Sequence, residues 1–218
     1  MRHPIPPRET VADQIARILG ERIMTGELAP GVKLRQDHIA TQFDASHVPV
    51  REALQKLEAR GLAVSQPRRG TRVAPLDEAA MKEVVEMRAA LEVVALRHAA
   101  PNLNAIAYLK IEDALTACDT ALTLLSWDAA NRAFHRALIA PCQMPRLLAT
   151  LDDLQITSSR YVFSRLRSAR WRPHSSHDHR QIVDALRARD ISTASALLQR
   201  HILTLERLSP VRDAAAEA

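Results

Sequence analysis

The chain has 218 residues, of which 47% are hydrophobic and 5 are glycine, and its formal net charge at pH 7 is +5. That length suits one large or two small domains, and the scarcity of glycine beside many Ala, Leu, Arg and Glu residues favours a mostly helical protein. No apolar run is long enough to span a membrane, and the start MRHPIPPRET lacks the apolar segment of a secretory signal. Cys118 and Cys142 are too few for a disulfide framework, so we expect a cytoplasmic protein with reduced thiols.

The positive charge is concentrated in the first third of the chain. Residues 1–75 hold 12 Lys/Arg against 8 Asp/Glu, a balance of +4, whereas residues 76–218 hold 18 against 17. Basic side chains supply sequence-independent affinity for phosphates, so this asymmetry indicates a nucleic-acid face on the N-terminal part. The alternative is a solvated basic surface with no partner.

The first predicted helix runs from about Thr10 to Met24 and ends at Thr25-Gly26. Its apolar residues recur at helical spacing, so they form one buried face. They are Val11, Ile15, Ile18, Leu19 and Ile23. We expect this helix to pack behind the segment that follows.

The segment from Leu34 to Val73 predicts a winged helix-turn-helix. A short helix carrying Ile39, Ala40 and Phe43 precedes a turn at Asp44-Ala45, and a second helix opens with Ser46. The Ser46 hydroxyl is expected to cap that helix by accepting from a backbone N–H, and Pro49 suits its first turn. Gly61 ends the helix, and strands Leu62 to Gln66 and Thr71 to Ala74 enclose Pro67-Arg68-Arg69-Gly70. Such an element places one helix in a DNA groove.

Beyond Pro75 the pattern predicts helices only, and therefore an antiparallel all-α bundle that can hold a small ligand. The expected helices are Asp77 to Ala100, Asn104 to Leu125, Asp128 to Ala140, Arg146 to Ser168, Ser176 to Arg189 and Ile191 to Leu208. Asp77 and Asp190 are placed to cap the first and last of them. The predicted domains are thus a winged helix over 1–75, a helical domain over 76–210 and a frayed tail over 211–218.

Three histidines share apolar helix faces in this second domain. His135 follows Asn131 by four residues, His179 lies on the stripe of Ile182 and Leu186, and His201 lies among leucines. A single inward histidine is more often a hydrogen-bonded core residue than a ligand. Three of them on three helices of one bundle instead predict a metal site. His174 and His177 are interpreted as solvent-exposed.

The N-terminal segment resembles the GntR family of bacterial transcription regulators, chiefly through VREALQKLEARGL followed by PRRGTRV. The helical remainder resembles the FCD subgroup of that family, through Arg88-Ala89-Ala90-Leu91-Glu92 and Phe134-His135-Arg136-Ala137-Leu138. The resemblance implies a ligand-responsive regulator, more usually a repressor, that binds a two-fold DNA operator as a homodimer. It also implies that the C-terminal domain binds the effector and dimerises.

The DNA-reading helix departs from the family pattern at two positions. The family has Ser-Arg-Thr-Pro-Val-Arg, where this chain has Ser46-His47-Val48-Pro49-Val50-Arg51, so His47 replaces an arginine suited to guanine. The resemblance and the docking geometry give the candidate DNA-binding residues as Arg35, Ser46, His47, Val48, Pro49, Arg51, Arg68, Arg69 and Gly70. The alternative for Arg51 is an ion pair with Glu52 or Glu58.

The resemblance also implies a divalent metal, because many FCD domains bind one through an Asp and three histidines. The matching residues are Asn131, His135, His179 and His201, so an amide, which is a neutral and weaker ligand, replaces the carboxylate. Three histidines still suit zinc or nickel and leave open positions for a small carboxylate effector. Arg88 and Arg160 are the candidates to hold such an anion.

Each of these arginines has another interpretation. Arg88 is placed to form a salt bridge with Glu92, and Arg160 belongs to a run with Arg165, Arg167, Arg170 and Arg172 that has the character of a solvated helix end.

Three other functions remain open at this point. A regulator that senses the metal ion itself would need no organic acid. A metal-dependent enzyme would need a general base, but no HExxH motif and no inward acid accompany the histidines. In a constitutive DNA-binding protein the histidines would only stabilise the bundle.

Overall fold

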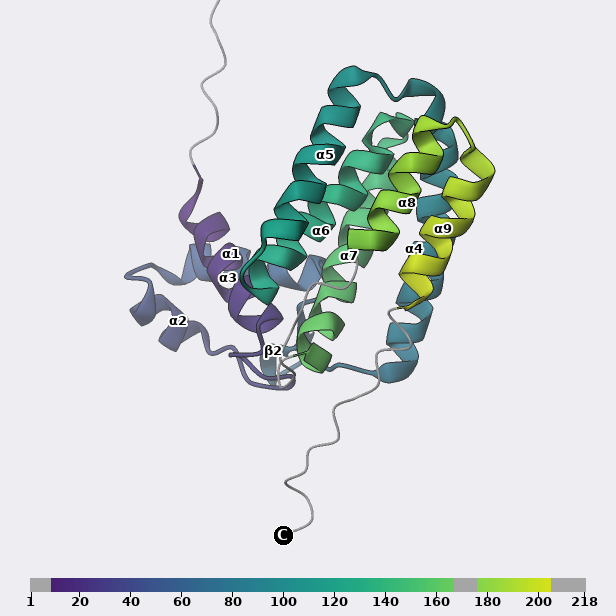
Figure 1. Cartoon of the computed structure of the whole chain (residues 1–218). Coiled ribbons are helices and arrows are strands. Elements are labelled where there is room, and N and C mark those ends of the chain that lie inside the picture. The colour runs from purple at the N-terminus through teal and green to yellow at the C-terminus, as the bar shows by residue number, and fades with distance from the viewer. Residues whose placement is uncertain (1–8, 167–175, 205–218) are drawn as a thin grey trace, which may run out of the picture. The chain divides into compact units, whose positions relative to one another are not determined.

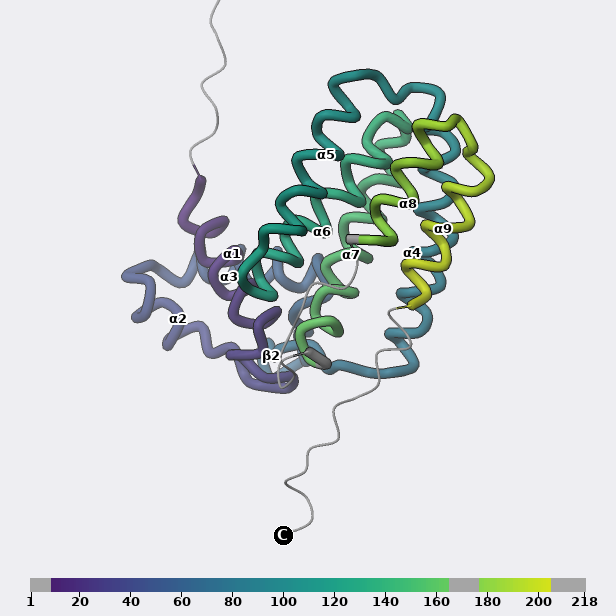
Figure 2. The backbone as a smooth tube through the Cα atoms, in the orientation of Figure 1, coloured from purple at the N-terminus to yellow at the C-terminus, as the bar shows by residue number. Residues whose placement is uncertain are grey.

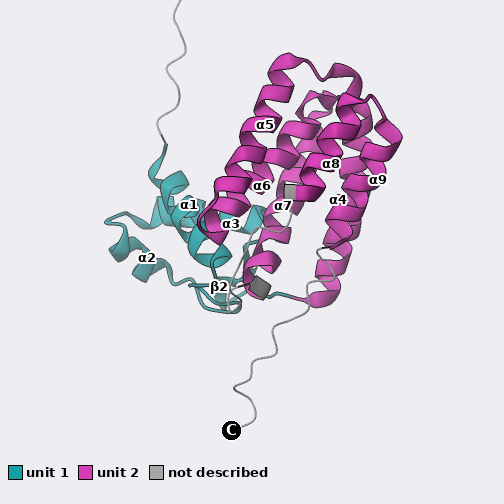
Figure 3. Cartoon of the chain, in the orientation of Figure 1, with its two compact units in different colours: residues 1–76 teal, residues 77–218 magenta. Residues whose placement is uncertain are grey.

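The computed structural model of the chain describes residues 9–166 and 176–204. They belong to two compact units, unit 1 from Met1 to Leu76 and unit 2 from Asp77 to Ala218, which Figure 3 colours separately. The predicted tail 211–218 and the arginines 167, 170 and 172 lie outside the described residues. None of the described helices is both long enough and apolar enough to cross a membrane.

Unit 1 is a three-helix domain with a two-stranded wing. Its elements are α1 (Val11–Met24), α2 (Gln36–Gln42), α3 (His47–Ala59), β1 (Ala63–Gln66) and β2 (Gly70–Val73). Helix α1 packs against α3, as predicted, and Ile15, Leu19 and Leu57 are almost wholly excluded from solvent. Thr10 caps α1, because its hydroxyl accepts from Asp13 N at 3.1 Å while the Asp13 carboxylate accepts in return.

The wing is an antiparallel hairpin in which Ala63 pairs with Val73 and Gln66 with Gly70. The turn between the strands holds Arg68 at φ 62° and Gly70 at φ 80°. A left-handed arginine is uncommon, and this conformation places consecutive basic residues at the tip of the hairpin. An isolated bridge between Lys33 and Arg72 joins the preceding loop to β2.

The predicted N-cap of α3, the second helix of the helix-turn-helix, is wrong. Ser46 occupies the N-cap position of α3 in an extended conformation, but its side chain makes no cap hydrogen bond. The first backbone N–H groups of α3 therefore receive no hydrogen bond from the hydroxyl of Ser46, which is an exposed residue. Exposed N–H groups at a helix N-terminus suit an anion such as a phosphate.

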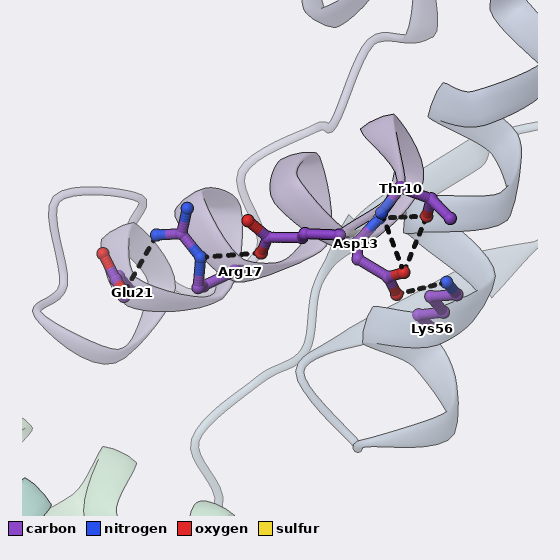
Figure 4. A network of polar contacts seen from close by, with 6 residues as sticks. Thr10, Asp13, Arg17, Glu21 and Lys56 are labelled. Carbon is purple, nitrogen blue, oxygen red and sulfur yellow. Dashed lines mark hydrogen bonds and ion pairs between the residues drawn. The ribbon is translucent and has the colours of Figure 1, made fainter. Parts of the chain in front are cut away.

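A network of polar side chains ties α1 to the C-terminal half of α3, as Figure 4 shows. The Asp13 carboxylate lies between Thr10 and the ammonium of Lys56, with which it forms an ion pair. Hydrogen bonds from Lys56 and Thr10 lower the pKa of Asp13 to about 2. Farther along α1, Arg17 pairs with Glu9 and Glu21. The Asp13–Lys56 pair joins α1 to α3, the Arg17 pairs stay at α1, and each of these exposed pairs contributes little to stability.

Unit 2 is the predicted helical bundle (Figures 1 and 2). Its α-helices are α4 (Glu78–Ala99), α5 (Ala105–Thr120), α6 (Leu124–Ile139), α7 (Pro145–Leu166), α8 (Ser176–Arg187) and α9 (Ile191–Leu203). Short 3-10 turns, η1 (Ala100–Asn102) and η2 (Ala140–Cys142), follow α4 and α6. Helix α4 packs against α7 and α9, α5 packs against α6, and α8 packs against α9. Asp77 and Asp190 cap α4 and α9, as predicted.

The break between α5 and α6 differs from the prediction. Helix α5 ends at Thr120 and not near Leu125, and α6 begins at Leu124, four residues before Asp128. The reason is a capping box in which the Thr123 hydroxyl accepts from Ser126 N at 3.1 Å and the Ser126 hydroxyl accepts from Thr123 N at 3.1 Å. Cys118 and Cys142 are free and buried.

Candidate metal and effector site

Three imidazoles from three helices meet in the interior of unit 2. His135 projects from α6, His179 from α8 and His201 from α9, and one nitrogen from each lies within 4.8 Å of the other two. His135 and His179 are almost wholly buried, and the side chain of His201 is 13% exposed. The predicted histidine set is therefore brought together by the fold, and His201 is its most exposed member.

The spacing of two imidazole nitrogens equals that of two ligands of one metal ion. His179 Nε2 lies 3.1 Å from His201 Nε2, and the ring centroids of His135 and His201 are 5.4 Å apart. Two nitrogens bound to one zinc ion at about 2.05 Å in tetrahedral geometry lie about 3.3 Å apart. The His179–His201 pair already has that spacing, and His135 contributes a nitrogen within 4.8 Å of both.

Two carboxylates orient the outer nitrogens of these histidines. Glu92 Oε2 lies 2.7 Å from His135 Nδ1, and Asp178 Oδ2 lies 3.4 Å from His201 Nδ1. Both contacts favour the tautomer that carries its proton on Nδ1, which leaves Nε2 as the lone-pair donor. A carboxylate behind a histidine is the usual second layer of a metal site, since it fixes the ring and makes the ligand more basic.

Glu92 is also the centre of a buried polar cluster. Its Oε1 accepts from Arg88 Nε at 2.7 Å and from Gln155 Nε2 at 3.3 Å. Burial raises the pKa of Glu92, but the charge of Arg88 and then the interaction with His135 Nδ1 outweigh burial, so its pKa lies well below the ordinary value. The carboxylate is therefore ionised at neutral pH and neutralises Arg88.

Burial keeps the imidazoles uncharged. It lowers the pKa of His135 and of His179, and it lowers that of His201 to about 4. The neighbouring histidines lower the pKa of His179 and of His201 further, because two protonated rings would repel each other. Asp178 acts in the opposite direction and raises the pKa of His201. At neutral pH all three rings can therefore donate a lone pair without first losing a proton.

The fourth predicted ligand, Asn131, lies one helical turn before His135 on α6. Its Oδ1 is buried and makes no hydrogen bond within the described part of the chain. The same is true of Ser158 Oγ on α7 and of His179 Nδ1. An unsatisfied buried acceptor is costly, and this oxygen, one turn before His135, suits a cation bound beside the three imidazoles.

The two predicted effector arginines are both buried. Arg88 makes the predicted alternative salt bridge with Glu92, and its side chain is 4% exposed. Arg160, on α7, is also buried, and burial lowers the pKa of its guanidinium. His177 is exposed, as expected, whereas His174 lies outside the described residues.

The predicted DNA-binding residues of unit 1 lie at its surface. Pro49 is half-buried, and the other candidates, Arg35, Ser46, His47, Val48, Arg51, Arg68, Arg69 and Gly70, are exposed. The alternative ion pairs of Arg51 are not formed in the described structure. Glu58 instead accepts hydrogen bonds from Ser65 N and Oγ, both at 2.9 Å, and Arg51 has no ion-pair partner among the described residues.

Comparison with known proteins then decides the family. Residues 11–73 match the family described as bacterial regulatory proteins, gntR family, and residues 83–204 match the FCD domain. The chain belongs to the GntR family. It is a transcription regulator with an FCD domain, so the predicted resemblance is confirmed. These families are DNA-binding regulators, which sets the metal-dependent enzyme aside.

Relatives of this GntR-family chain match over most of their length. The HTH-type transcriptional repressor GlaR of Escherichia coli K12 is 30% identical over 86% of this chain and 90% of its own. A probable D-xylose utilization operon transcriptional repressor of Paenarthrobacter nicotinovorans is 33% identical over 89% and 87%. The structure of E. coli McbR/YncC shares the fold, with a TM-score of 0.74 at 22% identity over 91% of this chain and 98% of that one.

Sequence reasoning on this GntR-family chain missed the groups behind the histidines. The sequence suggests Glu92 only as a partner of Arg88, and it singles out neither Asp178 nor Gln155. Glu92 lies 43 residues from His135, so no helical spacing connects them. One available signal was a carboxylate on the same helix stripe as buried residues such as Ala89 and Leu96.

Proposed function

We propose that the chain is an effector-responsive repressor that binds a two-fold operator as a homodimer and senses a small carboxylate beside a divalent metal in unit 2. The observation that carries the sensor is the buried set His135, His179 and His201 with Asn131 Oδ1 left without a partner in the described structure. GlaR and the probable D-xylose utilization operon regulator are both named repressors, which supports repression and not activation of transcription. Because its target is DNA, we expect the chain to act in the cytoplasm.

The DNA-binding surface is proposed to consist of the N-terminal part of α3 together with the wing. Arg51 is exposed without an ion pair in the described structure, so its guanidinium can reach a base edge or a phosphate. Val48 exposes 65% of its surface, and an apolar side chain there suits contact with a thymine methyl group. Arg68 and Arg69 at the wing tip supply phosphate contacts.

Fluorescence anisotropy with an operator selected from random duplexes tests this surface. Arg51→Ala is expected to weaken binding by about 1–3 kcal/mol, which is roughly 5- to 150-fold. Arg60→Ala is the matched control, because Arg60 is also exposed but lies at the C-terminal end of the same helix. Equal losses in the two variants would contradict the proposed docking of the N-terminal part of α3.

The dimer is proposed to form through the outer face of α4. Met87 and Val94 are 48% and 40% exposed, and Leu91 lies between them at helical spacing. An exposed apolar stripe of this kind is typical of a protein–protein interface, and binding to a two-fold operator requires a second copy of the chain. Met87→Glu with Val94→Glu is expected to give a monomer in light scattering, with operator affinity lowered at least tenfold. A variant pair that stays dimeric would refute this interface.

The metal is proposed to be zinc or nickel held by His135, His179 and His201, with Asn131 as a weak fourth ligand. When bound, the ion supplies a Lewis-acidic centre with open positions for an anionic effector. Arg88 and Arg160 are proposed to contribute positive charge that attracts such an anion. Since Glu92 already engages Arg88 Nε, we expect Arg88 to act through the rest of its guanidinium.

Elemental analysis of untagged protein beside a His179→Ala variant tests the metal site. About one equivalent of zinc or nickel per chain, lost in the variant, supports it. Wild-type protein that takes up no metal, with or without a carboxylate, would contradict it. Operator affinity that follows free metal in the absence of any carboxylate would instead indicate a metal-ion-responsive regulator.

A further inference from the structure

His47 is the first residue of α3, the helix that is proposed to enter the DNA groove. Its side chain is 57% exposed, and Arg51, four residues later, is exposed on the same face of the helix. The first N–H groups of α3 receive no hydrogen bond from Ser46, so this end of the helix also suits a phosphate. In a helix-turn-helix the N-terminal residues of the second helix contact base edges, so the imidazole of His47 is among the groups that can read a base.

An acidic residue of α2 lies beside this imidazole. His47 Nε2 is 3.7 Å from Oδ1 of Asp37, which belongs to the first turn of α2. The Asp37 carboxylate makes no other ion pair or hydrogen bond with the residues that the structure describes. An ionised carboxylate only accepts hydrogen bonds, so it favours the form of the ring that carries a proton on Nε2. In the uncharged ring the other nitrogen, Nδ1, then keeps its lone pair and acts as an acceptor.

We infer that His47 reads an amino-bearing base, adenine or cytosine, through Nδ1, and that Asp37 is the residue that positions it for this role. In the major groove adenine and cytosine present amino groups as donors, whereas guanine and thymine present carbonyl oxygens as acceptors. An acceptor on the protein therefore selects the amino group. An arginine at this position would select the opposite class, because it donates to guanine. The inference rests on the proposed DNA-binding surface of α3 and adds the class of base that it selects.

Operators with modified bases test which hydrogen-bonding group His47 uses. An operator is selected from random duplexes, and fluorescence anisotropy at pH 8 locates the base pair whose replacement weakens the wild type but not His47→Ala. Unsubstituted purine in place of adenine, or 2-pyrimidinone in place of cytosine, removes only the amino group. This change is expected to weaken wild-type binding by about fivefold, the worth of one hydrogen bond, and to leave His47→Ala unaffected. Replacing N7 of the purine in that base pair by carbon should not change the Kd, because N7 is itself an acceptor.

Asp37→Asn tests the positioning role. An amide offers both a donor and an acceptor, so it no longer determines which nitrogen of His47 carries the proton, and the preference for the amino group should fall to about twofold or less. Asp44→Asn is the matched control, because Asp44 is an exposed acid in the turn before α3, at a φ of 47° that asparagine also adopts. Both variants should bind every duplex more tightly, since each removes a negative charge from unit 1, but Asp44→Asn should keep the full preference.

The outcomes separate the inference from the proposed function. Wild-type protein that tolerates loss of the amino group but is weakened by loss of N7 uses His47 as a donor, which overturns the inference. An Asp37→Asn variant that keeps the full preference overturns the role of Asp37. If His47→Ala binds the operator as tightly as the wild type while Arg51→Ala binds it weakly, the inference fails and the DNA-binding surface stands. If neither variant loses affinity, both fail together.

Discussion

The replacement Glu92→Gln is expected to destabilise unit 2 by about 3–5 kcal/mol, because it leaves a buried guanidinium without its counter-charge. The side chains of Arg88 and Glu92 are 4% and 0% exposed, and Arg88 Nε lies 2.7 Å from Glu92 Oε1. Glutamine keeps the length of the side chain and an oxygen that can accept from His135 Nδ1. The change therefore removes the charge while it preserves most of the packing.

Urea unfolding followed by tryptophan fluorescence measures this loss. Both tryptophans, Trp127 and Trp171, belong to unit 2, so the signal reports on that unit. With a urea m-value of about 2 kcal/mol/M, the midpoint should fall by about 2 M in metal-free protein. Adding Arg88→Met to Glu92→Gln should recover most of the loss, since the double variant buries no unpaired charge.

An exposed ion pair of unit 1 serves as the control for the buried pair of Arg88 and Glu92. Arg17 and Glu9 are half exposed, so Arg17→Gln should leave the stability of unit 1, measured by far-ultraviolet circular dichroism, almost unchanged. The reasoning is refuted if Glu92→Gln costs no more than that surface variant. It is refuted equally if the double variant is no more stable than Glu92→Gln alone.

Two further predictions concern stability, one for the residue Gly20 and one for the protonation of His201. Gly20→Ala should stabilise unit 1 by about 0.5–1 kcal/mol in thermal unfolding, because alanine favours the helix and its Cβ would meet Leu57 and Leu62 at ordinary contacts of 3.6 and 3.5 Å; a destabilised variant would contradict this. Metal-free protein should lose stability below pH 6.5, because the unfolded chain binds a proton at His201 before the folded chain, whose pKa there is about 4. One such histidine costs about 1.4 kcal/mol at pH 5.5, and a flat urea midpoint between pH 7 and 5 would contradict it.

The helices were predictable from the spacing of apolar residues along each of them. The inward position of each histidine was predictable in the same way, from its spacing to apolar residues on its own helix. His135 shares a face with Asn131 and Leu138, and that periodicity is visible without a structure. Which nitrogen faces the site was not predictable, because Glu92 and Asp178 fix the tautomers from other positions in the fold. Contacts across helices depend on packing angles, which periodicity does not encode.

Helix ends were predicted less well where the capping residues were unusual. The capping box at Thr123 uses Ser126 at its third helical position, where Glu or Gln is the usual signal. Leu122, which is 92% exposed, also extended the apparent apolar pattern of the preceding helix beyond its end. Ser46 shows the opposite error, because a residue type that favours N-caps makes no cap bond there.

His179 distinguishes a sensor from a bundle in which histidines are merely structural. It is fully buried, its ring stacks on Phe134 with centroids 4.1 Å apart, and its Nδ1 has no hydrogen-bond partner in the part of the chain that is described. Its Nε2 contact with His201 is worth about 1 kcal/mol, whereas burying an unsatisfied polar nitrogen costs about 1–3 kcal/mol. An apolar side chain should therefore suit the metal-free bundle at least as well.

We accordingly expect His179→Leu to leave metal-free unit 2 as stable as the wild type or up to about 2 kcal/mol more stable. Bound metal stabilises the wild type by about 2.7 kcal/mol at one hundred times its Kd, and this increment should vanish in the variant. Leu138→Ala in the same core should cost about 2–5 kcal/mol and shows that the assay detects a packing defect. A metal-free His179→Leu protein that loses as much as Leu138→Ala would assign the imidazole to the fold. A stable variant that no longer responds to metal would show that the histidine is kept for its ligand at the expense of stability.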